Sequence, residues 1–375
     1  MKPEDQKLIN GWEYTTIGER IFFEYGKSPN KVKDKKGKYY LMGSSGISGR
    51  ANDYTTHSPA IILGRKGTID KPIYSVTPCW AIDTTYFVDK FPKDDSKYIF
   101  YLLNSQNLKS LNASTGVPSL SRDTLHSLRV SLPPLPEQKK IAKIISTIDL
   151  NLNVIQKKID KTKILRRSTM QSLLSRGVSN DTYKKSNIGT IPSKWEVKRL
   201  TDVLEVKHGF QFRDHHFAKK GFPIVKIANL IDGKTVDIAS VNSFLSLEAS
   251  SEFKKFKLNE NDILMALTGA TLGKVSIYNS KSIAFQNYRV GKFQSKDTQI
   301  VNNHFVYWIL QSEYIQNLVK NLVNEAAQPN IGKVDLEKMY IPVPPLKEQI
   351  KIVHLLTSID QLIQSTERKF DQLKL

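Results

Sequence analysis

Cysteine is almost absent from this chain, and long apolar runs are missing altogether. Cys79 is the one cysteine among 375 residues, which excludes a disulfide and a thiolate zinc site and fits a reducing compartment. No stretch of 18 apolar residues occurs, and the opening MKPEDQKLINGW lacks the basic and apolar parts of a signal peptide. We therefore expect a cytoplasmic, soluble protein that makes no membrane contact.

The motifs of common catalytic sites are also missing. The chain has no GxSxG, GxGxxG or HExxH, and no Asn-Pro-Pro-aromatic run with which an amino-methyltransferase grips its target base. The nearest phosphate-binding candidate, Gly269–Val275, has three residues between its glycines where a Walker A loop has four, and Val275 stands where a hydroxyl is needed. We predict a structural turn there.

Three histidines, His208, His215 and His216, lie close together in the sequence and raise the question of a metal site. No acidic or thiolate residue stands at helical ligand spacing from them. We therefore expect these histidines to form hydrogen bonds, and we expect a non-catalytic chain that holds no metal and no cofactor.

Acidic residues are scarce relative to basic ones. The chain has 36 Asp and Glu against 56 Lys and Arg, which gives a formal charge of +20, and its pI is about 9.6. Such a surplus usually indicates a polyanionic partner. The basic residues are spread along the whole chain instead of gathering on one amphipathic helix, which favours nucleic acid over an anionic membrane.

Basic and amide residues on the predicted loops are the candidate DNA contacts. Arginine and lysine neutralise phosphates, and arginine, glutamine or asparagine can pair with base edges in the major groove. Any one of them is more often a solvated surface charge, so the prediction rests on the group. The candidates are Lys27, Lys31, Lys33, Arg50, Arg65, Lys66 and Lys71 in the first half, and Lys207, Gln211, Arg213, Lys226, Lys274, Gln286, Asn287 and Arg289 in the second.

The chain is an internal duplication. The stretch Leu132–Asp149 has a second copy at Ile341–Asp360, in which Pro134, Glu137 and Gln138 recur after a constant shift of 211 residues. The domain starts at Trp12 and Trp195 differ by only 183, so the second domain carries 28 extra residues in its loops. Two copies of one scaffold with diverged loops suggest that both domains have the same kind of function but bind different targets.

Short apolar stretches divided by Gly, Pro, Ser and Asn predict strand-rich domains, with helices at Lys97–Asn112 and Val306–Val323. We expect an α+β fold with two mixed globular domains and two long helices. The expected boundaries are 1–134 for the first domain, 135–178 for the first helix, 179–345 for the linker and second domain, and 346–375 for the second helix.

Both predicted helices carry an apolar stripe with the alternating steps of 4 and 3 that form a coiled-coil seam. The stripes are Ile141, Ile145, Ile148, Leu152, Ile155 and Ile159, and Ile352, Leu356, Ile359, Ile363, Thr366, Phe370 and Leu373. Each stripe could pack on its own domain. Two equivalent stripes on rods of up to roughly 60 Å favour antiparallel pairing about a pseudo-twofold axis. Leu375 corresponds to Ile164, so we expect Leu165–Arg176 to pack elsewhere, on the N-terminal segment or a partner subunit.

These motifs closely resemble those of the DNA-specificity subunits of type I restriction-modification systems, over nearly the whole chain. The resemblance rests on PPLPEQ and PPLKEQ at the two helix starts, on Gly116–Ser121, and on the domain starts at Trp12 and Trp195. The matching helix-start residues, which the resemblance makes structural and subunit-contacting, are Glu137, Gln138, Glu348 and Gln349. Base-reading residues do not carry over, because the loops differ between members.

The resemblance implies that each globular domain is a target-recognition domain that reads one half of a bipartite, asymmetric site in double-stranded DNA. The helices would set the spacer and dock two modification subunits, which bind S-adenosylmethionine and methylate adenine. Restriction subunits with translocase and nuclease activity would complete the complex. This chain would be the non-catalytic recognition subunit.

Two alternatives from other classes stay open at this point. The chain could be a self-sufficient DNA-modifying enzyme, in which case it would transfer label from S-adenosylmethionine without partners. It could also be a coiled-coil scaffold that binds nucleic acid non-specifically, in which case competition between duplexes at fixed salt would show no sequence preference.

Overall fold

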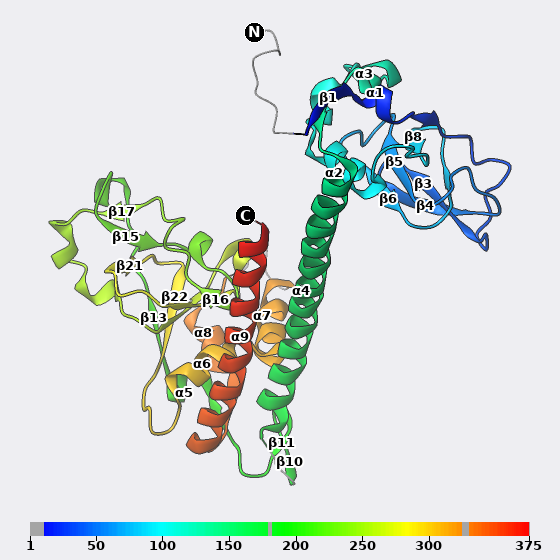
Figure 1. Ribbon diagram of the computed structural model, residues 1–375. Helices are drawn as coiled ribbons and strands as arrows, with labels where there is room; N and C mark the ends of the chain where they lie inside the picture. Colours follow the sequence, from blue (N-terminus) through cyan, green and yellow to red (C-terminus); the bar gives the residue numbers. More distant parts are fainter. Residues whose placement is uncertain (1–10, 179–181, 325–329, 375) are drawn as a thin grey trace. The chain divides into compact units, whose positions relative to one another are not determined.

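The computed structural model describes residues 11–178, 182–324 and 330–374. The chain divides into two compact units, residues 1–154 and 155–375, and helix α4 (Leu135–Arg176) is continuous across the division (Figure 1). The expected boundary at residue 179 and the two chain ends lie outside the described residues. Strand-rich domains followed by long helices confirm the expected α+β class.

Unit 1 is built on a four-stranded sheet in the order β2-β8-β5-β6 and a three-stranded sheet in the order β4-β3-β7. Its central strand β5 is buried along its whole length because AIILG is apolar on both faces. The strands are β1 (Glu13–Thr16), β2 (Glu24–Tyr25), β3 (Tyr39–Gly43), β4 (Gly46–Ala51), β5 (Ala60–Gly64), β6 (Ile73–Ser75), β7 (Cys79–Ala81), β8 (Thr85–Val88) and β9 (Arg129–Leu132). The short helices are α1 (Ile17–Arg20), α2 (Ser96–Ser105) and α3 (Arg122–His126).

Unit 2 repeats this plan with two five-stranded sheets, β13-β22-β19-β20-β16 and β14-β17-β15-β21-β18. Its strands are β10 (Tyr183–Ser186), β11 (Gly189–Pro192), β12 (Glu196–Arg199), β13 (Leu204–His208), β14 (Phe217–Ala218), β15 (Phe222–Val225), β16 (Lys234–Thr235), β17 (Phe244–Leu245), β18 (Lys257–Leu258), β19 (Asp262–Ala266), β20 (Val275–Tyr278), β21 (Ala284–Gln286), β22 (Val290–Ser295) and β23 (Tyr340–Val343). The helices are α5 (Leu200–Val203), α6 (Asn303–Leu310), α7 (Glu313–Asn324), α8 (Lys333–Lys338) and α9 (Leu346–Lys374).

Two predicted helices are shorter or more broken than expected. The helix expected at Lys97–Asn112 ends at Ser105, where the side chains of Ser105 and Gln106 donate to the Leu102 carbonyl and compete with the backbone. The helix expected at Val306–Val323 divides into α6 and α7 at Ser312, whose hydroxyl accepts from the Ile315 N–H. Local polar side chains, which periodicity ignores, end these helices.

The two units share one chain path. Strand β3 pairs in parallel with β7, and β15 pairs in parallel with β21 at the equivalent register. At the same point in each unit a glycine passes close to this strand. A Cβ on Gly26 would lie 2.0 Å from the Ile82 carbonyl oxygen, and one on Gly209 would lie 2.3 Å from that of Asn287. Only glycine fits there, which fixes the structural correspondence of the repeats.

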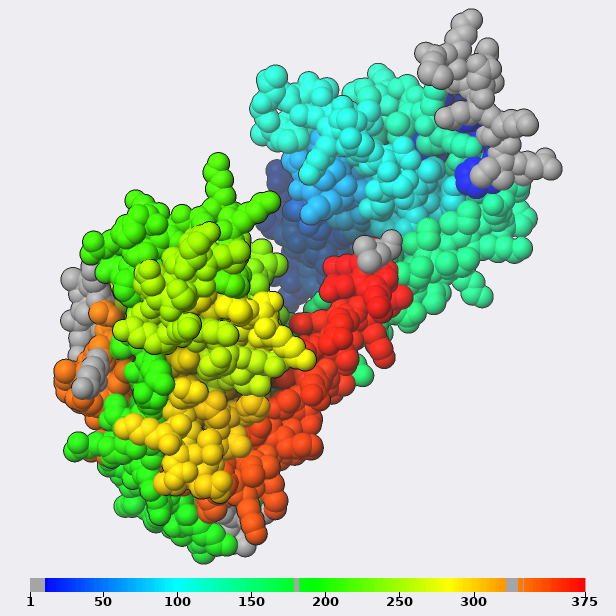
Figure 2. Space-filling model, turned by 90° about the vertical axis from the view of Figure 1, so that its left-hand side faces the viewer, coloured from blue at the N-terminus to red at the C-terminus, as the bar shows by residue number. Residues whose placement is uncertain are grey.

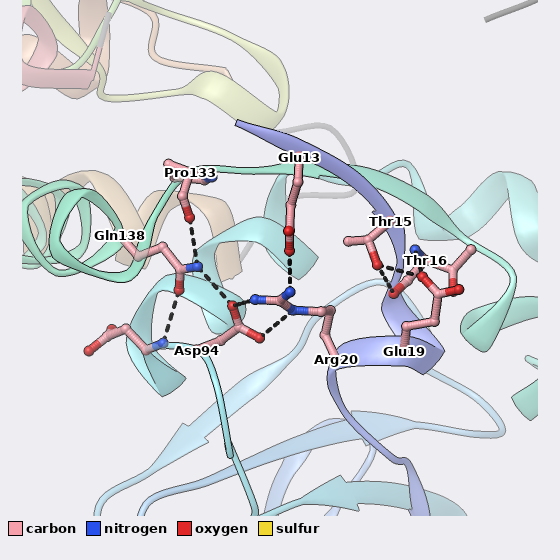
Figure 3. A network of polar contacts seen from close by, with 9 residues as sticks. Glu13, Thr15, Thr16, Glu19, Arg20, Asp94, Pro133 and Gln138 are labelled. Carbon is pink, nitrogen blue, oxygen red and sulfur yellow. Dashed lines mark hydrogen bonds and ion pairs between the residues drawn. The ribbon is translucent and has the colours of Figure 1, made fainter. Parts of the chain in front are cut away.

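A buried glutamine anchors the start of each long helix to its own unit. The Gln138 amide accepts from the Asp95 N–H at 3.0 Å and donates to the Pro133 carbonyl at 2.9 Å (Figure 3). Gln349 accepts from the Asn302 N–H and donates to the Pro344 carbonyl, both at 2.8 Å. Asp95 and Asn302 are the N-caps of α2 and α6. The same amide therefore links the helix start to the same neighbouring helix in both units.

The tryptophan that opens each domain bonds to the glutamate beside that glutamine. Trp12 Nε1 lies 3.4 Å from Glu137 Oε1, and Trp195 Nε1 lies 2.9 Å from Glu348 Oε2. The first and last strands of each unit also pair, β1 with β9 and β12 with β23. These contacts explain structurally why the tryptophan and the EQ pair occur together twice.

An ion pair beside the first anchor has no counterpart in the second. Arg20 bonds to both carboxylate oxygens of Asp94, at 2.8 and 2.7 Å, and also to Glu13 (Figure 3). Hydrogen bonding to Asp94 raises the pKa of Arg20 further above its ordinary value. At the equivalent positions unit 2 has Val203 and Val301, both in its apolar core. The same two positions are thus occupied by a buried ion pair in unit 1 and by apolar side chains in unit 2.

Within unit 2, α9 runs antiparallel to the second part of α4 (Figure 1). It lies beside the strand-rich part of the same unit (Figure 2). Lys163 pairs with Glu367 at 2.7 Å, and Arg166 pairs with Asp360. Because the later residue on α4 meets the earlier residue on α9, these pairs confirm the expected antiparallel arrangement.

The expectation for the end of the first helix is wrong. Met170, Leu173 and Leu174 are buried in the core of unit 2, in the same cluster as Ile352 and Leu356. The segment Leu165–Arg176 therefore packs within the second domain. After Ile159 the 4-and-3 series passes through the polar residues Thr162, Arg166 and Thr169 before it reaches Leu173, so it does not reveal this apolar surface.

The predicted seam residues do not behave alike. Ile159, Ile352, Leu356 and Ile363 are buried, and Ile145, Leu152, Ile155, Ile359 and Phe370 are half-buried. Ile141 packs against the core of unit 1, as an own-domain contact. Ile148 and Leu373 are 38% and 43% exposed, which corrects their assignment to a buried seam.

Candidate nucleic-acid interface

The candidate residues of unit 1 lie on its surface, as a DNA contact requires. Arg65 is half-buried, and the exposed candidates are Lys27, Lys31, Lys33, Arg50, Lys66 and Lys71. In the described part of the unit, none of these seven side chains forms an ion pair with a carboxylate. Their positive charge is therefore available to an external anion.

Aromatic side chains lie among these charges. The Arg50 guanidinium lies 4.7 Å from the Tyr40 ring centre, on neighbouring strands β4 and β3, and Lys38 lies 5.6 Å from Tyr39. Tyr40 is 38% exposed. Arginine that lies over an aromatic ring can still donate from its N–H groups, so this hairpin combines charge with stacking surface.

Sequence reasoning missed a second arginine–aromatic group in unit 1. The Tyr25 ring lies 4.8 Å from the Arg122 guanidinium and 5.6 Å from that of Arg65, and Arg122 also lies 5.1 Å from the Phe22 ring. We call Phe22, Tyr25, Arg65 and Arg122 the stacked array. Arg122 was not a candidate because no local sequence pattern links it to Tyr25.

One histidine lies behind the array. His126 Nε2 accepts from the Phe23 N–H at 3.3 Å, and its ring stacks on Phe23 and contacts Phe22. Burial lowers the pKa of His126, and the positive charge of Arg122 lowers it further, against a smaller opposing effect of Asp123. The fold therefore holds this histidine as a neutral acceptor.

In unit 2 the candidates divide into surface and core residues. The exposed ones are Lys207, Gln211, Arg213 and Arg289, and the half-buried ones are Lys226 and Lys274. Arg289 lies 5.1 Å from the Tyr288 ring. Lys226 donates to the Ser243 hydroxyl at 2.6 Å and lies 4.9 Å from the Phe217 ring.

Gln286 and Asn287 must be removed from the candidates. Gln286 is 1% exposed, and its amide donates to the carbonyls of Lys207 and Val290, at 2.8 and 2.7 Å. Asn287 is 8% exposed and lies where the chain crosses Gly209. The Gln286 amide completes the hydrogen bonding of buried strands and Asn287 is itself buried, so neither is available to a base edge.

The histidines of unit 2 border an aromatic cluster. His216 Nδ1 accepts from the Arg213 N–H at 2.9 Å, and its ring packs edge-on against Phe210, Phe212 and Phe253. Within the described ranges no group of three or more His, Cys, Asp and Glu is arranged to hold a metal ion. The hydrogen bond expected for this group is observed at His216.

The loop at Gly269–Val275 is a turn, as its spacing predicted. Residues 269–271 form a single 3-10 turn after β19, with Gly269 at φ 74°, and the chain then enters β20. Lys66 in unit 1 and Thr268 in unit 2 make equivalent isolated bridges, to Ser119 and Asn330. The loop belongs to the repeated scaffold and has no helix of phosphate-binding length behind it.

Comparison with known proteins matches both halves of the chain. The family model described as type I restriction modification DNA specificity domain matches residues 9–163 and 192–375. A type I restriction enzyme MjaVIII specificity subunit from Methanocaldococcus jannaschii is 29% identical over 100% of this chain and 93% of its own length. The EcoBI specificity subunit from Escherichia coli is 22% identical over 84% of this chain and 70% of its own length.

Solved structures agree on the fold. The S subunit of a type I restriction-modification system from M. genitalium superposes with a TM-score of 0.67 at 17% identity, covering 100% of this chain and 96% of its own. A chain from a structural study of complex assembly and conformational transition in a type I system gives 0.55 at 16% identity, over 98% and 96%. Among the described residues, no helix is long and apolar enough to span a bilayer. With the family model matched in each half, this chain belongs to the type I restriction modification DNA specificity family and is a specificity subunit.

Proposed function

We propose that each unit reads one half of a bipartite, asymmetric DNA site through the major groove, while α4 and α9 set the distance between the halves. The observation that carries this proposal is the repeated anchor: Gln138 and Gln349 tie a strand-rich domain to the start of a long helix in the same way twice. Two domains that share a scaffold but differ in their surface loops are suited to recognising two different DNA half-sites in a similar way.

We further propose that this chain performs no chemistry itself. Methyltransferase subunits would dock on the helices and bring S-adenosylmethionine, and restriction subunits would join that core. The charge of +20 supports a duplex DNA partner. Incubating the purified chain alone with DNA and labelled S-adenosylmethionine should transfer no label, whereas transfer by the chain alone would contradict a pure recognition role.

Domain exchange tests independent reading. Replacing residues 195–341 with the corresponding domain of another specificity subunit should change one half of the methylated site and leave the other half and the spacing unchanged. The reciprocal exchange of residues 12–132 should change only the other half. Sequencing of methylated adenines in a host that carries the exchanged chain and its modification subunits measures both. A change in both halves after a single exchange would contradict the proposal.

A further inference from the structure

We propose that Arg122, held on the rings of Tyr25 and Phe22, reads a base in the half-site of unit 1. This inference rests on the proposed function, because it assigns a reading residue within a surface already taken to face DNA. It names a residue that neither its sequence neighbourhood nor the fold alone would select.

The Arg122 guanidinium is held against two aromatic rings, but its N–H donors are unused among the described residues. It lies 4.8 Å from the Tyr25 ring centre and 5.1 Å from that of Phe22. Within the described residues it has no carboxylate partner and no hydrogen-bond acceptor. Tyr25 and Phe22 are 47% and 57% exposed, so the array opens to solvent and not into the core.

Arg65 is the second arginine whose guanidinium lies over the Tyr25 ring. Its Nε and Nη2 both donate to the Asp83 carbonyl, at 3.2 and 3.0 Å, so part of its donor fork is already used. Its guanidinium lies 5.6 Å from the Tyr25 ring. Arg65 therefore positions the ring, and Arg122 is the member of the pair whose donors remain available.

A guanidinium with fixed orientation and unused donors fits the acceptors of a base edge. Its planar fork can pair bidentately with O6 and N7 of guanine, and stacking in advance reduces the entropy lost on binding. The exposed Phe22 ring beside it offers an apolar surface of the kind that contacts a thymine methyl group. The acceptor that this site best suits is a guanine in the major groove.

The comparison between units favours base reading over phosphate binding. Strand register places His208 opposite Gly291 where unit 1 has Tyr25 opposite Tyr86. Buried Leu267 occupies the place of Arg65, and Glu205 that of Phe22. In sequence the counterpart of Arg122 is Lys333, which has no planar fork. Phosphate contacts carry no sequence information and need not differ between halves, whereas base contacts must.

The test uses the full chain with its modification subunits and maps methylated adenines before and after substitution. Arg122→Ala should relax the preference at one position of one half-site by about 5- to 100-fold, the range expected for a lost bidentate contact. Arg122→Lys should not restore it, because the fork is lost while the charge is kept. Arg129→Ala, which removes an exposed arginine from β9 of the same unit, should leave the site unchanged.

Three results would count against parts of this assignment. An unchanged site in Arg122→Ala, with melting like that of the unaltered chain, would overturn it. Uniformly weaker binding to all duplexes, with a smaller salt dependence, would also overturn it in favour of a phosphate contact. If the unaltered complex showed no defined methylation site, the proposed function itself would fail, which is a distinguishable outcome.

Discussion

At the scale of single residues, the two units show how much of a repeated site is obligatory. The paired glutamines and the tryptophan–glutamate bonds occur in both, because buried helix starts need their polar groups satisfied. The Arg20–Asp94 pair occurs in only one, and Val203 and Val301 replace it in the other. The amide anchor thus belongs to the repeated scaffold. The two positions beside it are occupied by an ion pair in one unit and by two valines in the other.

Asp94→Val should destabilise unit 1 by about 3–5 kcal/mol, because it leaves a largely buried guanidinium without its main partner. The double variant Arg20→Val with Asp94→Val should recover most of that loss, since apolar side chains occupy both equivalent positions in unit 2. Hydrogen exchange of unit 1 segments in mild denaturant measures the effect, and unit 2 segments serve as the internal control. If the double variant were as unstable as the single one, two valines would not be enough to replace the ion pair in unit 1.

Unit 1 should lose stability in mild acid through His126. Its pKa is lower in the folded state than the ordinary value of about 6.5, so the unfolded chain binds the proton more readily. The neutral form contributes its full stability above that ordinary value, and this contribution is lost as the pH falls through the lower folded value. Thermal melts between pH 7.5 and 5 measure it.

The matched variant for this effect is His126→Gln, which keeps a hydrogen-bond acceptor near the Phe23 N–H but cannot take up a proton at these pH values. Its melting temperature should fall less than that of the unaltered chain over the same pH range. Equal falls in the two proteins would assign the acid sensitivity to other groups.

At the scale of elements, α4 serves two units with two parts of one helix. Its first part begins at the Gln138 anchor of unit 1, and its last turns supply Met170, Leu173 and Leu174 to the core of unit 2. Along α9, Lys163–Glu367 and Arg166–Asp360 fix the antiparallel register. Arg166 also lies 5.2 Å from the Trp308 ring, which places this pair against α6 of the same unit.

Lengthening α4 should lengthen the gap between half-sites if the helix acts as a spacer. Four residues inserted after Ile155 add about 6 Å of helix, which corresponds to one or two base pairs at about 3.4 Å each. Methylation mapping should show both half-sites retained and the spacer increased. Replacing four residues of the β16–β17 loop with four others, a change of equal extent without added helix, should leave the spacer unaltered. An unchanged gap after insertion would reject the spacer role.

At the scale of the whole molecule, duplication explains both the size and the asymmetry of the chain. The extra 28 residues of the second domain enlarge its sheets and add the aromatic cluster around Phe253, but they leave the strand crossing at Gly209 intact. The net charge of +20 provides attraction to DNA that does not depend on sequence. Under the proposed function, discrimination between sequences would come from the surface loops in which the repeats differ.

The sequence by itself determined the duplication, the two helix starts and the family, because these depend on residue identity at fixed spacing. It also predicted the strand-rich domains and the turn at Gly269, since Gly, Pro and apolar alternation act locally. It did not predict where α2 ends or that α6 and α7 separate, because side chains such as Gln106 and Ser312 end a helix by local hydrogen bonds that periodicity does not detect.

Only the tertiary structure decided which polar residues are available for recognition. Gln286 and Asn287 looked like base readers but are buried, whereas Arg122, which was not a candidate, begins α3 and lies on the rings of Tyr25 and Phe22. Tyr25 and Arg122 are almost a hundred residues apart in the printed sequence. Burial and stacking depend on contacts between such distant segments, and the spacing of residues in the sequence does not predict these contacts.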